Sequence, residues 1–463
     1  MIAKLGAALL LSLALLTACG GSAAAPQPGP RSGTGIFVGD IHFNPLADGT
    51  LTDRLAQAPA TQWDSILAGS AQTPYRYFPA ASDTNFPLLQ SLLAAMRQQV
   101  PNPDIVFVSG DSLAHGLPQF FDKFATSPTA AYATFANTAE QYVAMKLSQT
   151  FPNAQIVPTL GDWDTPCKGG DTYPGTGFLA SFASAWSPAV NRYGGAPGFQ
   201  AAFATGGYYS TRFPIDPRGR LIVLDTEPWS VDYDTTNVCE VGGETLAATE
   251  LAWLGAQLDA ARSSGQRVWI LGHIPPGIGV PGKACPSTTT PFYTDDNASK
   301  VNALLEQNRG ILTLGIFGHE HLDDFRLLQD SGGPIFGVKI VPSVSPLDGN
   351  NPAFVRFTYD PNAGVISNAT TWYLANFSSA STTVPGVWLS EYDFDATYGQ
   401  SALDTNGIAG AVGRILTQPS AQAAFARYYS SSSGTPTPSP FSAYGCALSS
   451  STAADYAACA CPS

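Results

Sequence analysis

The stretch Thr34-Gly35-Ile36-Phe37-Val38-Gly39-Asp40-Ile41-His42 decides the fold, because it joins a short apolar run to a glycine, an acid and a histidine. The same arrangement recurs along the chain. Short β-branched or aromatic runs predict buried strands, and each run ends beside a glycine and a polar block: residues 34–38, 104–109, 155–160, 267–271 and 311–317. A further run, Leu221 to Leu224 before Asp225, is built alike but carries no histidine.

Helical stretches separate these runs. Apolar residues recur at spacings of three and four in residues 87–100 and 249–262, which predicts amphipathic helices. Strands that alternate with helices indicate an α/β sheet, and ligands of such sheets bind outside the carboxyl ends of the strands. We therefore expect the polar blocks to meet in space.

All five histidines of the chain lie in or beside these polar blocks. The blocks are Gly39-Asp40-Ile41-His42, Gly110-Asp111 with His115 four residues further on, Gly161-Asp162-Trp163-Asp164, Gly272-His273-Ile274-Pro275-Pro276 and Gly318-His319-Glu320-His321. Imidazole nitrogen and carboxylate oxygen are the ligands that zinc, manganese and iron prefer. The alternative is that each histidine lies at a strand end with its hydrogen bonds satisfied by ordinary partners. This alternative can explain a single block, but it explains all five blocks together poorly. The blocks therefore predict a metal centre.

The order of the blocks resembles that of the calcineurin-like metallophosphoesterases over residues 36–377. Finer details resemble one branch, acid sphingomyelinase and its acid sphingomyelinase-like phosphodiesterase relatives. These details are His115 four residues after Asp111, Gly-His-Ile-Pro-Pro-Gly at 272–277, Asp324-Phe325 after the last block, and Glu391-Tyr392-Asp393-Phe394 with Tyr398-Gly399. Because the first expected strand begins soon after residue 33, we expect the form without a saposin domain.

The resemblance implies an α/β fold, namely a four-layer metallophosphoesterase sandwich in which helices flank two central mixed sheets. A C-terminal helical subdomain would follow. We expect the metallophosphoesterase domain at residues 34–376 and the helical, cysteine-containing subdomain at 377–463, with helices at 401–416 and 420–429.

The resemblance also implies two divalent metal ions, with zinc expected first and manganese or iron as alternatives. The expected ligands are Asp40, His42 and His321 for one ion and Asp162, His273 and His319 for the other, with Asp111 shared by both. A hydroxide that bridges two cations is a nucleophile at neutral pH and suits in-line attack on phosphorus. In the family, a histidine at the place of His115 serves the transition state or the leaving group. The alternative is that His115 only supports a ligand or the core.

The sequence departs from the family pattern at residues 161–164, where Gly-Asn-His and an acidic residue would be expected. Asp162 can ligate as asparagine does but adds a negative charge, so the bound water should be less acidic. We expect slower attack or a different preferred metal. Trp163 replaces a histidine that helps to bind or protonate the phosphate, and an indole donates one hydrogen bond without transferring a proton. Catalysis would then depend on His115.

The implied activity is that of a metal-dependent phosphoric diester hydrolase similar to sphingomyelin phosphodiesterase. The substrate would be a phosphate ester, either a sphingomyelin-like phospholipid headgroup or a nucleotide. Two alternatives stay open. One is a catalytically weakened binding protein, because Asp162 and Trp163 replace the family's Asn-His, and the other is a surface lipoprotein whose metals only hold loops together.

Composition excludes other classes of protein. A hydrophobic content of 44% excludes general disorder, and the chain is long enough to bury a large core. A formal net charge of -13 argues against a nucleic-acid-binding surface and against attraction to anionic lipid. We expect a monomer.

The first residues predict export. Met1 to Thr17 carries Lys4 and the apolar run Leu5 to Leu16, which is typical of a secretory signal. Leu16-Thr17-Ala18-Cys19 resembles the lipobox of bacterial lipoproteins. We therefore expect a lipoprotein signal peptide at 1–18, a lipid on Cys19, a flexible tether at 19–33, and membrane contact through the lipid only, on the periplasmic or cell-surface side. The alternative is an ordinary signal peptide with an incidental cysteine.

Six further cysteines form an even set, and disulfides are the default in an oxidising compartment. The sequence alone allows many pairings. The resemblance implies Cys239 with Cys285 and Cys446 with Cys459, which leaves Cys167 with Cys461. A zinc site at Cys459-x-Cys461 is the alternative.

Overall fold

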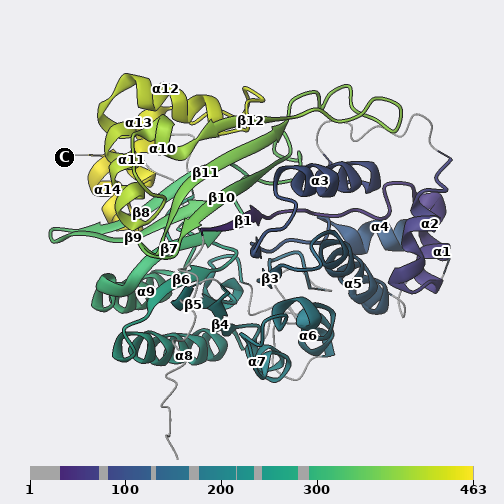
Figure 1. The fold of residues 1–463 in the computed structure, drawn as a ribbon, viewed down its shortest axis with the longest axis horizontal. Coiled ribbons are helices and arrows are strands. Elements are labelled where there is room, and N and C mark those ends of the chain that lie inside the picture. The colour runs from purple at the N-terminus through teal and green to yellow at the C-terminus, as the bar shows by residue number, and fades with distance from the viewer. Residues whose placement is uncertain are drawn as a thin grey trace, which may run out of the picture.

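A computed structural model describes the protein over residues 32–71, 82–126, 132–165, 177–214, 216–233, 242–279 and 291–461. Two six-stranded sheets form its centre (Figure 1). In spatial order, the first sheet contains β12 (Trp388–Asp393), β11 (Val365–Leu374), β10 (Ala353–Asp360), β1 (Gly33–Val38), β2 (Ile105–Val108) and β3 (Gln155–Pro158). The second contains β4 (Tyr209–Phe213), β5 (Asp216–Val223), β6 (Arg267–Leu271), β7 (Leu312–Phe317), β9 (Gly333–Ile340) and β8 (Asp324–Asp330).

Both sheets are mixed. In the first sheet, β1, β2 and β3 are parallel, while β10, β11 and β12 add antiparallel pairings. In the second, β5, β6, β7 and β9 are parallel, and β4 and β8 are antiparallel edge strands. The parallel strands place their carboxyl ends at one edge of each sheet, where the chain turns into the polar blocks.

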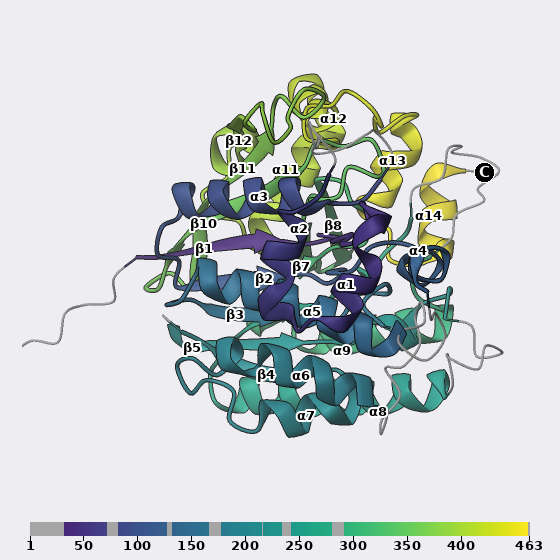
Figure 2. The same cartoon turned by 90° about the vertical axis from the view of Figure 1, so that its right-hand side faces the viewer.

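Helices cover the outer faces of the sheets (Figures 1 and 2). The helices that precede residue 308 are α1 (Thr52–Gln57), α2 (Trp63–Leu67), α3 (Phe86–Gln99), α4 (Leu117–Phe124), α5 (Tyr132–Thr150), α6 (Gly177–Val190), α7 (Phe199–Gly206), α8 (Gly243–Ser263) and α9 (Asp295–Gln307). Leu88, Leu89, Leu92 and Leu93 give α3 its buried face, and Asn85 caps its first turn by accepting a hydrogen bond from the Leu88 amide.

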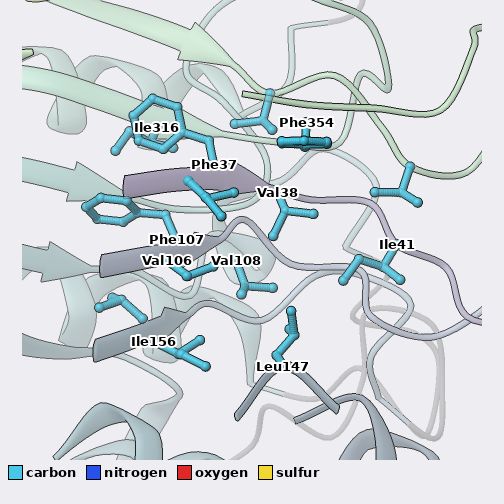
Figure 3. Packing of buried hydrophobic residues seen from close by; sticks show 14 of the residues in the cluster. Phe37, Val38, Ile41, Val106, Phe107, Val108, Leu147, Ile156, Ile316 and Phe354 are labelled. Carbon is cyan, nitrogen blue, oxygen red and sulfur yellow. The ribbon is translucent and has the colours of Figure 1, made fainter. Parts of the chain in front are cut away.

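Aromatic side chains fill the space between the two sheets. Phe37 stacks on Phe357 at a centroid distance of 4.6 Å, and Phe107 lies 6.2 Å from Phe213 of the second sheet. Phe213 in turn stacks on Trp269 at 5.3 Å. Figure 3 shows Phe37 and Phe107 among the buried side chains of this layer. The expected four-layer sandwich of two mixed sheets with flanking helices is confirmed.

The C-terminal helices are α10 (Phe394–Tyr398), α11 (Thr405–Thr417), α12 (Pro419–Tyr428), α13 (Phe441–Ala447) and α14 (Ala453–Ala460). The Thr405 hydroxyl joins α11 to the second sheet, because it donates to the Thr313 carbonyl at 3.0 Å and accepts from the Gly337 amide at 3.1 Å. A Cβ at Gly337 would lie 2.8 Å from the Ile408 Cβ, so glycine permits this close approach. One strand, β12, lies beyond residue 376, so the first sheet continues into the segment expected to form the helical subdomain.

A disulfide joins Cys446 to Cys459, with a Cα–Cα distance of 5.7 Å. Cys461 is also disulfide-bonded. The expected residues Cys19, Cys167, Cys239 and Cys285 lie outside the described residues. Within the described ranges, every helix is too short or too polar to cross a membrane.

Candidate metal centre

Polar side chains gather where the parallel strands end. Asp40 and His42 follow β1, Asp111 follows β2 and Asp162 follows β3. From the second sheet, His273 follows β6, and His319 and His321 follow β7. All of these side chains are buried except that of His319, which is 23% exposed. Segments far apart in the sequence thus converge at the edge predicted from the strand runs.

The first ligand set consists of Asp40, His42, Asp111 and His321, whose potential ligand atoms all lie within 4.8 Å of one another. His42 Nε2 lies 3.0 Å from His321 Nε2 and 3.2 Å from Asp111 Oδ2. His321 Nε2 lies 3.6 Å from Asp40 Oδ1. Such a set of two imidazoles and two carboxylates suits zinc, manganese or iron.

The second ligand set consists of Asp162, His273 and His319. His273 Nε2 lies 3.1 Å from Asp162 Oδ1, and His319 Nδ1 lies 3.4 Å from the same oxygen. Asp111 joins the two sets, because its Oδ2 lies 3.2 Å from His273 Nε2 as well as 3.2 Å from His42 Nε2. One carboxylate oxygen is therefore placed to be shared by two cations.

The supporting hydrogen bonds fit metal ligation. His42 Nδ1 lies 2.9 Å from the Leu113 carbonyl and His273 Nδ1 lies 2.7 Å from the Ser109 carbonyl, so each Nδ1 donates and each Nε2 presents its lone pair to the centre. His321 Nδ1 lies 2.5 Å from Asp348 Oδ2 in the same manner. Asp40 Oδ2 is buried without a hydrogen-bond partner, which a cation would satisfy. The residues present fit two divalent ions.

Charge balance points the same way. Burial alone would lower the pKa of His273, but Asp111 and Asp162 raise that pKa well above its usual range. Burial would raise the pKa of Asp162, yet hydrogen bonds from His273 and His319 hold it well below its usual range. The carboxylates thus favour positive charge beside His273, where a cation would lie, whereas burial and then His115 and His321 lower the pKa of His42.

The backbone around the ligands is strained. Within the described residues, seven non-glycine residues have a positive φ, and five of them are candidate ligands: Asp40 (47°), His42 (44°), Asp111 (52°), His319 (75°) and His321 (62°). Such conformations are costly and cluster at functional sites. Glycines make room beside them, since a Cβ at Gly161 would lie 2.2 Å from Asp111 Oδ1.

His115 lies beside the first ligand set without being needed to complete it. Its ring stacks on that of His42 at 3.8 Å, and its side chain is 24% exposed. Asp83 holds it at two points, through His115 Nδ1 at 3.0 Å and the His115 backbone amide at 2.9 Å. The Trp163 ring lies 4.9 Å from the His115 ring, so these two side chains form one wall of the centre.

Comparisons with known proteins agree with this geometry. No family model matches the chain. Over 404 residues it is 24% identical to acid sphingomyelinase-like phosphodiesterase 3b of Mus musculus, covering 84% of this chain and 81% of that protein. It is 23% identical over 410 residues to a cyclic GMP-AMP phosphodiesterase of Mus musculus, covering 86% of this chain and 84% of that protein. The chain is thus similar to the acid sphingomyelinase-like phosphodiesterases.

A solved structure of a dimetal phosphatase from Danio rerio also resembles this acid sphingomyelinase-like chain. The TM-score is 0.40 at 14% identity, and the match covers 78% of this chain and 99% of that chain.

Three acids of this acid sphingomyelinase-like chain, the buried Asp83 and Asp164 and the exposed Asp348, support the centre but were given no role from the sequence. Asp83 orients His115, and Asp348 pairs with His321. Asp164 accepts hydrogen bonds from the amides of Ser112 (2.6 Å), Leu113 (3.1 Å) and Gly161 (2.9 Å), so it ties the loop after β2 to the loop after β3. Asp348 follows β9 at the same sheet edge, which was an available signal, whereas Asp83 precedes a helix and has none.

Proposed function

We propose that this chain is a phosphodiesterase that uses two divalent metal ions. The observation that carries the proposal is the sharing of Asp111 Oδ2 between two ligand sets, because one bridging carboxylate is what a dinuclear hydrolytic centre requires. Asp40, His42 and His321 would hold one ion and Asp162, His273 and His319 the other. We favour zinc, with manganese or iron as alternatives that the additional carboxylate of Asp162 makes more competitive.

When bound, two cations would activate a water for attack on phosphorus and neutralise the charge of the phosphate oxygens. The chain's own residues would supply the proton. His115 is exposed enough to meet a substrate, and because Asp83 engages its Nδ1, Nε2 is the nitrogen left to give a proton to the departing oxygen. Trp163, in contact with His115, would bound the substrate without exchanging a proton.

The proposed substrate is a phosphodiester, either a sphingomyelin-like phospholipid headgroup or a nucleotide. The names of the two relatives support both, since one is named for its likeness to acid sphingomyelinase and the other acts on cyclic GMP-AMP. A second candidate function is a catalytically weakened binding protein, and the presence of Asp162 and Trp163 in place of the family's Asn-His favours it.

We further propose that the chain is exported, monomeric and anchored by a lipid on Cys19, with no surface for nucleic acid.

The test combines turnover and metal content of the purified full chain. We expect hydrolysis of bis-(p-nitrophenyl) phosphate and close to two metal ions per chain by elemental analysis. Asp111→Asn should lose activity and metal together, because Asp111 serves both ligand sets. The matched control is Asp259→Asn, which changes a surface carboxylate on α8 that is 66% exposed. A stoichiometry of one or none after zinc or manganese is supplied would overturn the two-metal proposal, and two metals without turnover would favour the binding protein.

A further inference from the structure

A polar pocket lies beside β4 and β5 of the second sheet, away from the loops that carry the proposed metal ligands. It has a volume of about 290 Å³, and its lining residues are Gly195, Pro197, Ser210, Thr211, Arg212, Arg220 and Gln266. Gln266 lies just before the amino end of β6, whereas the proposed metal ligand His273 follows the carboxyl end of the same strand. Seven positions separate Gln266 from His273, or about 23 Å along a strand. The pocket is therefore distinct from the metal centre.

Two arginines face each other in this pocket. Arg212 of β4 and Arg220 of β5 are direct partners in the antiparallel register. Like charges that lie directly opposite each other in an antiparallel pair are destabilising. Arginine nevertheless occupies both of these paired positions, although glutamine or threonine would fit the same pleated surface without the repulsion.

No carboxylate relieves this repulsion within the part of the chain that the structure describes. Arg220 is partly buried and its Nη1 donates to Gln257 Oε1 at 3.1 Å, while Arg212 is exposed and has no ion pair with a described residue. Some other arginines of the chain have carboxylate partners, since Arg267 contacts Asp216 at 2.6 Å and Arg326 contacts Asp324 at 2.5 Å. Arg212 and Arg220 therefore face each other without a carboxylate partner in a chain whose net charge is -13.

The remaining polar groups of the pocket are uncharged. Ser210 Oγ donates to Gln257 Oε1 at 3.1 Å, so one glutamine carbonyl serves both Ser210 and Arg220. Gln266 Oε1 is buried without a hydrogen-bond partner. Rotation of the side-chain amide by 180° would exchange this oxygen for the amide nitrogen, which carries two N–H donors. The pocket therefore offers several donors and, among its lining residues, no carboxylate.

We propose that this pocket binds a phosphate-type oxyanion between Arg212 and Arg220. Guanidinium groups bind phosphate with paired, charge-assisted hydrogen bonds, and an anion between the two would turn their mutual repulsion into attraction for a common partner. The volume exceeds that of phosphate itself and leaves room for a small organic group. The same chemistry therefore suits free phosphate and the phosphate of a small monoester.

The experiment is calorimetric titration of the metal-loaded full chain with inorganic phosphate. We expect two classes of phosphate site in the unmodified chain. Asp111→Asn should remove one class, at the metal centre, and Arg212→Gln with Arg220→Gln should remove the other. Each single arginine variant should weaken the second class by about 10-fold or more. Arg218→Gln is the matched control, because Arg218 is an exposed arginine of the same segment that does not line the pocket.

Two further measurements are needed. One compares different phosphate compounds to identify the anion, and the other measures thermal unfolding to show that the arginine variants are folded. Phosphocholine or glycerol phosphate binding more tightly than phosphate would identify a monoester, and the reverse order would identify free phosphate. In phosphate-free buffer, the arginine variants should unfold at the same or a higher temperature than the unmodified chain, since repulsion is removed. Anion binding that the double variant leaves unchanged would overturn the proposal, as would a lower unfolding temperature, which would make the arginines structural. Failure of the two-metal proposal would instead appear only in the Asp111→Asn arm.

Discussion

His115 is the residue whose surroundings best separate a proton donor from a metal ligand. Its ring lies against His42, and its ligand nitrogen is close enough to those of His42 and His321 for the three to form a potential metal site of their own. Its hydrogen bond with Asp83 and its partial exposure favour the role of proton donor.

We therefore predict that His115→Ala keeps two metals and lowers kcat by about 100-fold to 10,000-fold, the usual effect of losing a proton-transfer group. Elemental analysis and steady-state kinetics on the same preparation check both parts. The deficit should shrink for p-nitrophenyl esters, whose leaving group departs without protonation. Loss of metal in His115→Ala would show that His115 is a ligand.

Asp162 and Trp163 are predicted to set the rate and the pH dependence of the centre. Asp162 lowers the charge of the metal cluster, so Asp162→Asn should move the rise of activity to lower pH. Trp163→His should raise kcat more for substrates with poor leaving groups than for p-nitrophenyl esters, because it restores a group that can donate a proton. The double variant should depart from the sum of the two effects, since neighbouring residues couple. Unchanged rates and pH profiles in all three variants would make both replacements neutral.

At the scale of elements, β12 carries a buried acid that predicts a pH effect on stability. Burial, followed by the nearby charge of Asp323, raises the pKa of Glu391 to about 8. Its Oε1 accepts from Ser432 at 2.7 Å, while Oε2 is buried without a partner. Between its ordinary pKa and about 8, the unfolded chain releases this proton and the folded chain keeps it, so stability falls as pH rises through this window.

Glu391→Gln removes that proton exchange and should raise the midpoint of thermal unfolding by about 2 °C or more at pH 8, with little difference from the parent at pH 4.5. Thermal melts of the two proteins across this range measure the effect. Because both carry the same metal centre, the difference between them isolates Glu391. A constant difference across pH would mean that the carboxyl is ionised in the folded state.

The elements that could be predicted from the sequence are those buried on both faces. β1, β6 and β7 are continuous apolar runs and were found at nearly their observed bounds, and α11 and α12 lie close to the two helices expected at 401–416 and 420–429. β5 was found only in part, because Asp216 to Arg220 interrupts the apolar pattern at its start. β10, β11 and β12 were not predicted, since each has one partly exposed face and polar residues along it. The placement of β10 beside β1 depends on contacts between distant segments, which no local pattern contains.

The residues of the metal centre divide in the same way, into those that a local sequence pattern reveals and those that depend on the three-dimensional arrangement. The seven proposed ligands were found because each closely follows a predicted strand, and the structure brings all seven together. Asp83 was missed because its role depends on a turn before α3 that places it next to His115.

At the scale of the whole molecule, the described chain begins at the amino end of the first strand, and the metal centre lies beyond that strand's carboxyl end. β1 begins at Gly33, and the metal loops follow its carboxyl end (Figure 2). We predict that Cys19→Ser shifts the protein from the detergent phase to the aqueous phase, or leaves it unprocessed, without changing the kcat of the folded protein on a soluble diester. Detergent-phase partitioning of both forms measures this. Identical partitioning would refute the anchor.

The distance along the chain between the ligands sets the timing of metal capture. His42 and His321 lie 3.0 Å apart in space but are separated by 279 positions in the sequence. During synthesis, His42 is therefore made long before His321. Neither ligand set is complete until β7 has joined the second sheet. For an exported chain, which crosses the membrane as an extended thread, the centre is assembled only on the far side. If the proposed export holds, the metal ions come from outside the cell's interior, and the supply in that compartment selects them together with the ligands.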